Sequence, residues 1–137
     1  MITNSDKETI AQAKKFAKKL DGGDVVVLTG DLGGGKTTFV RGLAEGLGLQ
    51  GPVTSPTFVI MQIYKGGANK PTLHHFDLYR IDDEEELRDV GFDDYMEDEE
   101  SIVVVEWGEK FPAMIPKRAK NILFKNLGAE KREIVFT

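Results

Sequence analysis

The chain has 137 residues, no cysteine and a formal net charge of −5, with 40% hydrophobic and 30% charged residues. This length is typical of one domain with a single hydrophobic core. The lack of cysteine excludes disulfides, thiolate metal sites and a cysteine nucleophile, and the acidic balance argues against a basic nucleic-acid-binding face. No apolar stretch has the length of a membrane span or the form of a signal peptide, so we expect a cytoplasmic protein.

An amphipathic helix is the first predicted element. Ser5 and Glu8 form a capping box, in which the Ser5 hydroxyl accepts from the Glu8 amide and Glu8 reaches back to the Ser5 amide. Apolar side chains then recur at helical spacing up to Leu20, and the glycines at 22 and 23 are expected to end the helix.

A strand, a glycine-rich turn and a helix follow in that order. Val25 to Leu28 is a continuous apolar run, typical of a strand buried on both faces of a parallel sheet. Residues 37–47 have apolar side chains on one helical face, and Gly48 is expected to cap that helix.

The rest of the chain predicts two hairpins, a short helix and a second buried strand. These are a hairpin of 57–64 with 72–76, a helix over 82–90, a buried strand over 102–105, a proline-containing loop over 111–116, and a closing hairpin of 121–127 with 132–136.

The turn after the first apolar strand carries a phosphate-binding motif. Residues 30–37, Gly-Asp-Leu-Gly-Gly-Gly-Lys-Thr, match G-x-x-x-x-G-K-[ST] in full, between a strand and a helix. The glycines let backbone amides approach phosphate groups, and the helix N-terminus favours an anion. Lys36 is expected to contact the β- and γ-phosphates, the Thr37 hydroxyl to bind Mg²⁺, and Thr38 to contact the α-phosphate.

Two acidic residues are candidates for the metal side of this site. Glu106 ends the run Ile102-Val103-Val104-Val105, and Asp77 follows a less apolar strand. Strand ends in open α/β sheets form binding sites, which favours a role for Glu106 over a merely solvated acid. The position of Asp77 alone leaves both interpretations open. Trp107 is predicted to lie in the core or an interface, with a place beside the nucleotide as the alternative.

Neither the histidines nor the acidic stretch predicts a site. His74 and His75 are adjacent, so in a strand they point to opposite faces and cannot chelate one metal together. We interpret them as ordinary strand residues. The Asp- and Glu-rich stretch over 82–100 is predicted to be a solvated surface, and a docking surface for a basic partner is the alternative.

Taken together, four segments resemble the TsaE (YjeE) family, an ATPase of bacterial tRNA threonylcarbamoyladenosine (t6A) synthesis. The matching segments are 30–39, 54–58, 75–80 and 105–107, in the family's order and spacing and over nearly the whole chain. Gly34 stands where the family usually has alanine, which this loop tolerates. The implied fold is a single-domain α/β P-loop NTPase over 1–137, with a mainly parallel central sheet, antiparallel hairpin additions and flanking helices.

The resemblance also implies roles for individual residues. Lys36, Asp77 and Glu106 would be catalytic, and Thr37, Glu106 and Asp77 would hold Mg²⁺. The nucleotide contacts would come from Gly33, Gly34, Gly35, Lys36, Thr37, Thr38, Thr57 and Trp107. Ser5 and Arg132 would approach the base, and residues 55–57 would form a switch-like loop.

The family's cofactors and partners follow in the same way. ATP and Mg²⁺ would be bound by a monomer that joins the TsaD and TsaB proteins, with tRNA contacted only indirectly. Phosphoryl transfer depends on positioning and electrostatics, so we expect slow hydrolysis by the isolated chain. The alternatives are a small-molecule kinase using the same loop, or a nucleotide-binding switch without turnover. A guanine signature is not met, because Thr72 stands where N-K-x-D requires aspartate.

Overall fold

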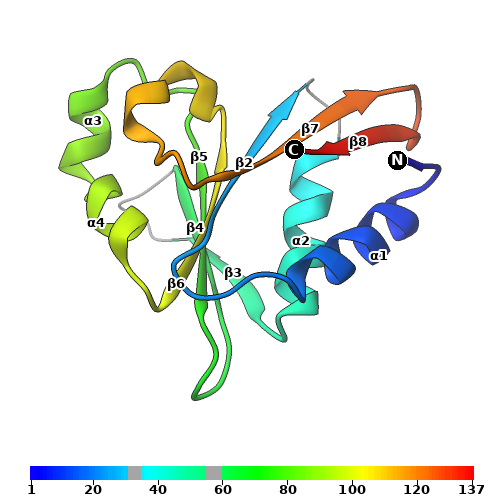
Figure 1. Cartoon of the computed structure of the whole chain (residues 1–137), viewed down its shortest axis with the longest axis horizontal. Coiled ribbons are helices and arrows are strands. Elements are labelled where there is room, and N and C mark those ends of the chain that lie inside the picture. Colours follow the sequence, from blue (N-terminus) through cyan, green and yellow to red (C-terminus); the bar gives the residue numbers. More distant parts are fainter. Residues whose placement is uncertain (31–34, 55–59) are drawn as a thin grey trace.

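An eight-stranded sheet forms the centre of the molecule, and helices cover both of its faces (Figure 1). The computed structural model describes residues 1–30, 35–54 and 60–137. Its elements are β1 (Ile2–Thr3), α1 (Asp6–Ala17), β2 (Val25–Gly30), α2 (Lys36–Gly46), β3 (Gln50–Thr54), β4 (Met61–Lys65), β5 (Thr72–Asp77), α3 (Glu84–Asp89), α4 (Phe92–Glu97), β6 (Ser101–Glu106), β7 (Lys120–Asn126) and β8 (Arg132–Phe136), with 3₁₀ turns at Gly108–Lys110 and Pro112–Met114. No helix in these ranges is long and apolar enough to cross a membrane.

The strand order is β1-β8-β7-β2-β6-β5-β4-β3. The four inner strands β7, β2, β6 and β5 run parallel, as predicted for the centre. The outer pairings β1–β8, β7–β8, β5–β4 and β4–β3 are antiparallel. Because antiparallel pairings outnumber parallel ones among the described strands, the sheet is mixed, and the prediction of a mainly parallel sheet is correct only for its centre. Both hairpins are confirmed, and each contributes one strand to the parallel centre.

The two central strands are apolar on both faces because each face is covered. Alternate residues of β2 and β6 divide between two cores. Val26, Leu28 and Val104 pack with α1 and α2, whereas Val25, Val103 and Val105 pack with α3, α4 and the turns after β6. Figure 1 shows α1 and α2 on one side of the sheet and α3 and α4 on the other. The continuous apolar runs of the sequence therefore have the physical cause that was predicted for them.

Helix α1 begins at the expected cap but differs from the predicted capping box. The Ser5 hydroxyl accepts from the Glu8 amide at 3.1 Å. The Glu8 carboxylate, however, accepts from the Asn4 amide at 3.3 Å instead of from that of Ser5. The helix also ends at Ala17, before the glycines that were expected to stop it, and the chain turns through residues 18–24 to reach β2.

Helix α2 is closely packed on α1 and ends as predicted. Gly48 adopts a left-handed φ of 73°, its amide donates to Glu45 O, and the Leu49 amide donates to Ala44 O. A Cβ atom on Gly42 would lie 2.5 Å from Ala13 Cβ, and one on Gly46 would lie 2.9 Å from Ala17 Cβ. The two helices thus approach at positions where neither has a large side chain.

Four other features differ from the predictions, each for a local reason. The helix predicted over 82–90 is shorter, because Asp83 caps α3 at Glu84. Helix α4 was not predicted, since only Phe92 and Met96 of its residues are buried among acids. Strands β1 and β3 were not predicted either. Strand β1 is only two residues long, and β3 contains Gly51 and Pro52, turn residues that are tolerated in an edge strand.

Candidate functional site

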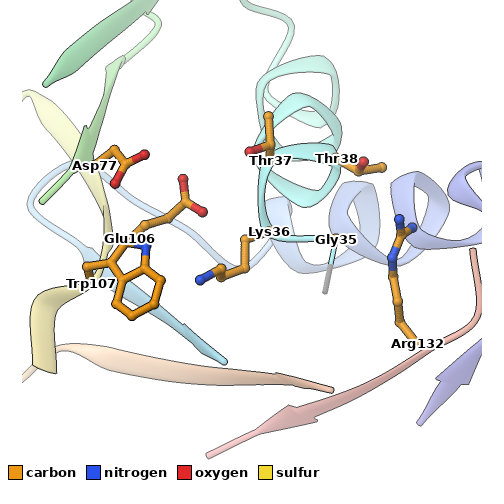
Figure 2. Close-up of a pocket in the computed structure, with 8 residues that line it drawn as sticks. All are labelled: Gly35, Lys36, Thr37, Thr38, Asp77, Glu106, Trp107 and Arg132. Atoms are coloured by element: carbon orange, nitrogen blue, oxygen red, sulfur yellow. The ribbon is translucent and has the colours of Figure 1, made fainter. Parts of the chain in front are cut away.

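A cleft of about 250 Å³ lies where the carboxyl ends of the inner strands meet the start of α2. Strands β5 and β6 supply the acids, α2 supplies the lysine and threonines, and β8 supplies an arginine (Figure 2). This is the edge of an open parallel sheet at which ligands bind. Among the described residues, eight line the cleft: Gly35, Lys36, Thr37, Thr38, Asp77, Glu106, Trp107 and Arg132.

Lys36 is held inside the cleft. Its side chain is 5% exposed, its Nζ donates to Gly30 O at 3.0 Å, and the same ammonium lies 4.5 Å from the centre of the Trp107 ring. Gly30 ends β2 beside Phe124 of β7, so close that a Cβ atom there would overlap the Phe124 backbone. The lysine is therefore fixed by the strand end and the tryptophan at the first turn of α2.

The two acids predicted for the metal side lie next to each other. Asp77 and Glu106 are direct register partners in the parallel pair β5–β6. Glu106 is 5% exposed, whereas Asp77 is exposed and accepts from the Tyr79 amide at 3.1 Å. Figure 2 shows both carboxylates and the Thr37 hydroxyl turned toward the same space. The structure thus brings together the three predicted metal ligands.

His75 lies behind the cleft and contacts Glu106, which the sequence interpretation did not predict. Its Nε2 lies 2.6 Å from Glu106 Oε2, with both side chains buried. The available signal was alternation along the strand, which puts His75 on the same face as Asp77. His74 points to the other face, where its ring packs against that of Tyr95 at a tilt of 48°, with ring centres 4.6 Å apart. Burial lowers the pKa of His74. The prediction that the two histidines do not chelate one metal fits this geometry.

Trp107 lies between the cleft, which its side chain lines, and the segment that follows β5. It has a left-handed φ of 65°, and its ring lies 5.1 Å from that of Tyr79. Lys110 stabilises the segment 78–81, because its Nζ donates to the carbonyl oxygens of Leu78, Tyr79 and Ile81 at 3.3, 2.7 and 2.8 Å. The tryptophan is therefore a wall of the cleft as well as a contact of Lys36.

Arg132 lines the opposite end of the cleft, beside Gly35 and Thr38 (Figure 2). It is 7% exposed, forms an ion pair with Asp6 of α1, and donates to Thr9 Oγ1 at 3.4 Å. Ser5 is not brought into the cleft; its hydroxyl caps α1. Its predicted approach to a bound base stays a prediction.

Some predictions lie outside the described residues or concern other surfaces. The predicted contacts of Gly33, Gly34 and Thr57, and the switch-like loop over 55–57, fall on residues that the structure does not describe. Most of the acidic side chains over 82–100 are exposed, as expected of a solvated surface. Within the described ranges, no group of three or more His, Asp or Glu side chains could hold a metal ion by itself.

Comparison with known proteins gives concordant matches. The family described as "Threonylcarbamoyl adenosine biosynthesis protein TsaE" matches residues 3–134. The tRNA threonylcarbamoyladenosine biosynthesis protein TsaE of Bacillus subtilis is 43% identical over 98% of this chain and 82% of its own length. That of Treponema pallidum is 37% identical over 97% and 96% of the two chains. The crystal structure of Bacillus subtilis YdiB superposes with a TM-score of 0.78 at 37% identity, covering 99% of this chain and 82% of that one.

Proposed function

Since this chain belongs to the TsaE family of threonylcarbamoyl adenosine biosynthesis proteins, we propose that it binds ATP with Mg²⁺ and hydrolyses it slowly. In this proposal the cycle supports t6A formation at position 37 of tRNA, in a complex with TsaD and TsaB. The observation that carries it is the meeting of Lys36 and Thr37 with Glu106 and Asp77 in one cleft. That cleft combines a phosphate-binding helix N-terminus with carboxylates at parallel strand ends.

The residues of the cleft fit Mg²⁺. Magnesium is bound by oxygen ligands, commonly one or two carboxylates together with nucleotide phosphates, and rarely by a cage made of protein alone. Thr37, Glu106 and Asp77 offer such oxygens, and the absence of a larger acidic cluster among the described residues agrees with a site that phosphates complete. Bound there, Mg²⁺ would neutralise charge that develops on the phosphoryl oxygens.

The other residues have complementary parts in the proposed reaction. Lys36 would exchange the Gly30 carbonyl for the β- and γ-phosphates, and the amides at the start of α2 would bind phosphate oxygens. Asp77 is the exposed acid of the pair and would orient the attacking water. Arg132, beside Thr38 and Gly35, lies on the side of the cleft where the α-phosphate, ribose and base would lie.

The arrangement of arginines supports slow turnover by the chain alone. Arg41 is exposed on α2. Arg80 is exposed and lines a second hollow, which shares Asp77 with the cleft but contains no residue of α2 among the described ones. Arg132 is paired with Asp6 at the far end from the acids. An arginine supplied by a partner accelerates phosphoryl transfer by about 10³–10⁵ in other NTPases. We therefore expect TsaD and TsaB to raise the rate.

The test is release of phosphate from Mg-ATP by the chain alone and with TsaB and TsaD. The expected result is slow release that rises with the partners and is lost in Glu106→Gln but not in Glu109→Gln, a matched change of an exposed acid three residues away. Release that ignores the partners would contradict the role in t6A synthesis and favour a small-molecule kinase. Tight nucleotide binding without any release would favour a switch protein.

A further inference from the structure

We propose that His75 is the positioning residue of this site: it fixes the Glu106 carboxylate, through a bond from its Nε2, in the orientation that Mg²⁺-nucleotide binding requires. The inference rests on the proposed function and assigns a residue that does not itself line the cleft. Its evidence is the buried contact of 2.6 Å between His75 Nε2 and Glu106 Oε2.

The sheet register creates this contact. His75 pairs with Val104, and Asp77 pairs with Glu106, in the parallel ladder between β5 and β6. His75 and Glu106 are thus diagonal neighbours on one face of the sheet, a separation that long side chains bridge. The face is the one that α2 covers. His75 therefore lies two residues before Asp77 along β5, on the same face of the sheet, and its side chain extends to Glu106 in the cleft.

Burial makes the bond necessary. The side chains of His75 and Glu106 are 6% and 7% exposed, and a buried carboxylate without a hydrogen-bond donor is strongly unfavourable. Within residues 1–30, 35–54 and 60–137, His75 is the side chain that lies within hydrogen-bond distance of the Glu106 carboxylate. A carboxylate has two oxygens, so Glu106 can accept from His75 through Oε2 and offer Oε1 to a cation or its bound water.

The surroundings also select one tautomer of His75. Its Nδ1 is buried and has no partner among the described residues. A proton on Nδ1 would bury an unpaired donor and leave Nε2 facing the carboxylate lone pairs. Of the two tautomers, the one with its proton on Nε2 satisfies the contact and leaves an unpaired acceptor on Nδ1 instead of an unpaired donor. The ring therefore acts as a fixed donor aimed at Glu106.

The expected functional effect follows from other metal sites. Groups that orient a metal-ligating carboxylate by hydrogen bonding change metal affinity or activity by about 10–100-fold when they are removed. If His75 only neutralised the cost of burying Glu106, its loss would reduce stability but leave the dependence on Mg²⁺ unchanged. The two roles therefore separate in a measurement of metal dependence.

The first test uses the nucleotide-free protein. Long-range ¹H–¹⁵N correlation spectra of the imidazole rings report which nitrogen carries the proton. We expect the proton of His75 on Nε2, and we expect Glu106→Gln to shift the His75 signals while leaving those of His74 in place. A proton on Nδ1, or His75 signals that ignore Glu106→Gln, would overturn the proposal whatever the protein does with ATP.

The second test compares His75→Leu, His75→Gln and the matched control His74→Leu. Calorimetry gives ADP affinity in EDTA and in Mg²⁺, and phosphate release gives kcat and its half-saturating Mg²⁺ concentration. We expect His75→Leu to keep its affinity in EDTA within about twofold but to need about 10–100-fold more Mg²⁺ or lose that factor in kcat. His75→Gln, which retains a donor, should recover most of this loss, and His74→Leu should show none.

The outcomes distinguish this inference from the proposed function. Mg²⁺-dependent binding by the unsubstituted chain, together with an unchanged Mg²⁺ requirement in His75→Leu, would overturn the role of His75 alone. A chain whose ADP affinity ignores Mg²⁺ would contradict the proposed function, and the tautomer spectra would still decide the contact. If His75→Leu does not fold, the Mg²⁺ requirement of His75→Gln and the tautomer spectra of the unsubstituted chain test the proposal instead.

Discussion

Alanine at Gly35 should both destabilise the fold and weaken nucleotide binding. Gly35 precedes α2 with a left-handed φ of 93°, a conformation that an L side chain adopts only with strain. A Cβ atom there would lie 2.5 Å from Nε and 2.9 Å from Cζ of Arg132. The arginine cannot move aside freely, because it is buried and paired with Asp6. Either the loop or the arginine must shift.

The size of the effect has two parts. The left-handed backbone costs about 1–2 kcal/mol for alanine, and steric overlap in a packed site costs about 1–3 kcal/mol. Gly35→Ala should therefore lower the free energy of unfolding by about 2–5 kcal/mol. For a chain of this length the unfolding entropy is roughly 0.3 kcal/mol/K near Tm, so a loss of about 3 kcal/mol would lower Tm by about 10 °C.

The assay is urea unfolding of Gly35→Ala, Arg132→Ala, the double variant and Gly67→Ala. Gly67 has open space around it and serves as the matched control, expected to be within about 1 kcal/mol of the parent. In the Arg132→Ala background the overlap is gone and only the strain remains. The coupling free energy between Gly35 and Arg132 should then be about 1–3 kcal/mol. ADP affinity, measured in parallel, should fall in Gly35→Ala.

Full stability and nucleotide affinity in Gly35→Ala would refute this reasoning. A large loss that is the same with and without Arg132 would refute the steric part alone and attribute the whole effect to backbone strain.

Three further predictions concern charged side chains of the site and its surroundings. Lys36→Met keeps an apolar side chain beside Trp107 but removes the ammonium. Calorimetry should therefore show ADP binding about 10–100-fold weaker, which corresponds to the roughly 1.5–3 kcal/mol of a hydrogen bond to a charged group. Unchanged affinity would contradict the role of Lys36. The pKa of His74 is lowered chiefly by burial, so the unfolded chain binds a proton at this residue more readily than the folded chain. The free energy of unfolding should therefore fall as the pH drops below about 6.5. Urea unfolding at about pH 7.5 and about pH 5.5 should show a smaller decrease in the free energy of unfolding for His74→Phe than for the parent. Lys110→Met removes the ammonium that donates to three carbonyl oxygens of the segment 78–81, of which Leu78 O keeps the Ile81 amide as a donor. Thermal unfolding should show a loss of about 1–3 kcal/mol.

Local patterns predicted the elements that form the site. The motif over 30–37 and the apolar run that ends in Glu106 needed only short-range physics: glycines that admit a phosphate, a helix start that favours an anion, and a strand buried on both faces. At Gly30 and from Gly35 onward, the structure has the strand end and the helix start that this motif predicts. The adjacency of Asp77 and Glu106 did not follow from these patterns, because the position of Asp77 alone left both interpretations open. It depends on the parallel pairing of β5 with β6.

What the sequence did not predict depends on register and on distant chain segments. The contact of His75 with Glu106 requires the pairing of His75 with Val104, which no local pattern specifies. The ion pair of Arg132 with Asp6 joins residues 126 positions apart, and depends on β8 lying beside the start of α1. The resemblance to a family pointed to Arg132 but did not give this partner.

The contact of Gly42 and Gly46 with Ala13 and Ala17 has a mechanical consequence. Packed interfaces with no spare volume deform little, so α2 cannot tilt or slide without carrying α1 along. Helix α2 carries Lys36 and Thr37 of the cleft, and Arg132 at the opposite end of the cleft pairs with Asp6, the first residue of α1. We therefore expect the helix pair to move as one unit, so that a displacement at the cleft end of α2 would also reach the outer face of α1, about a helix diameter away.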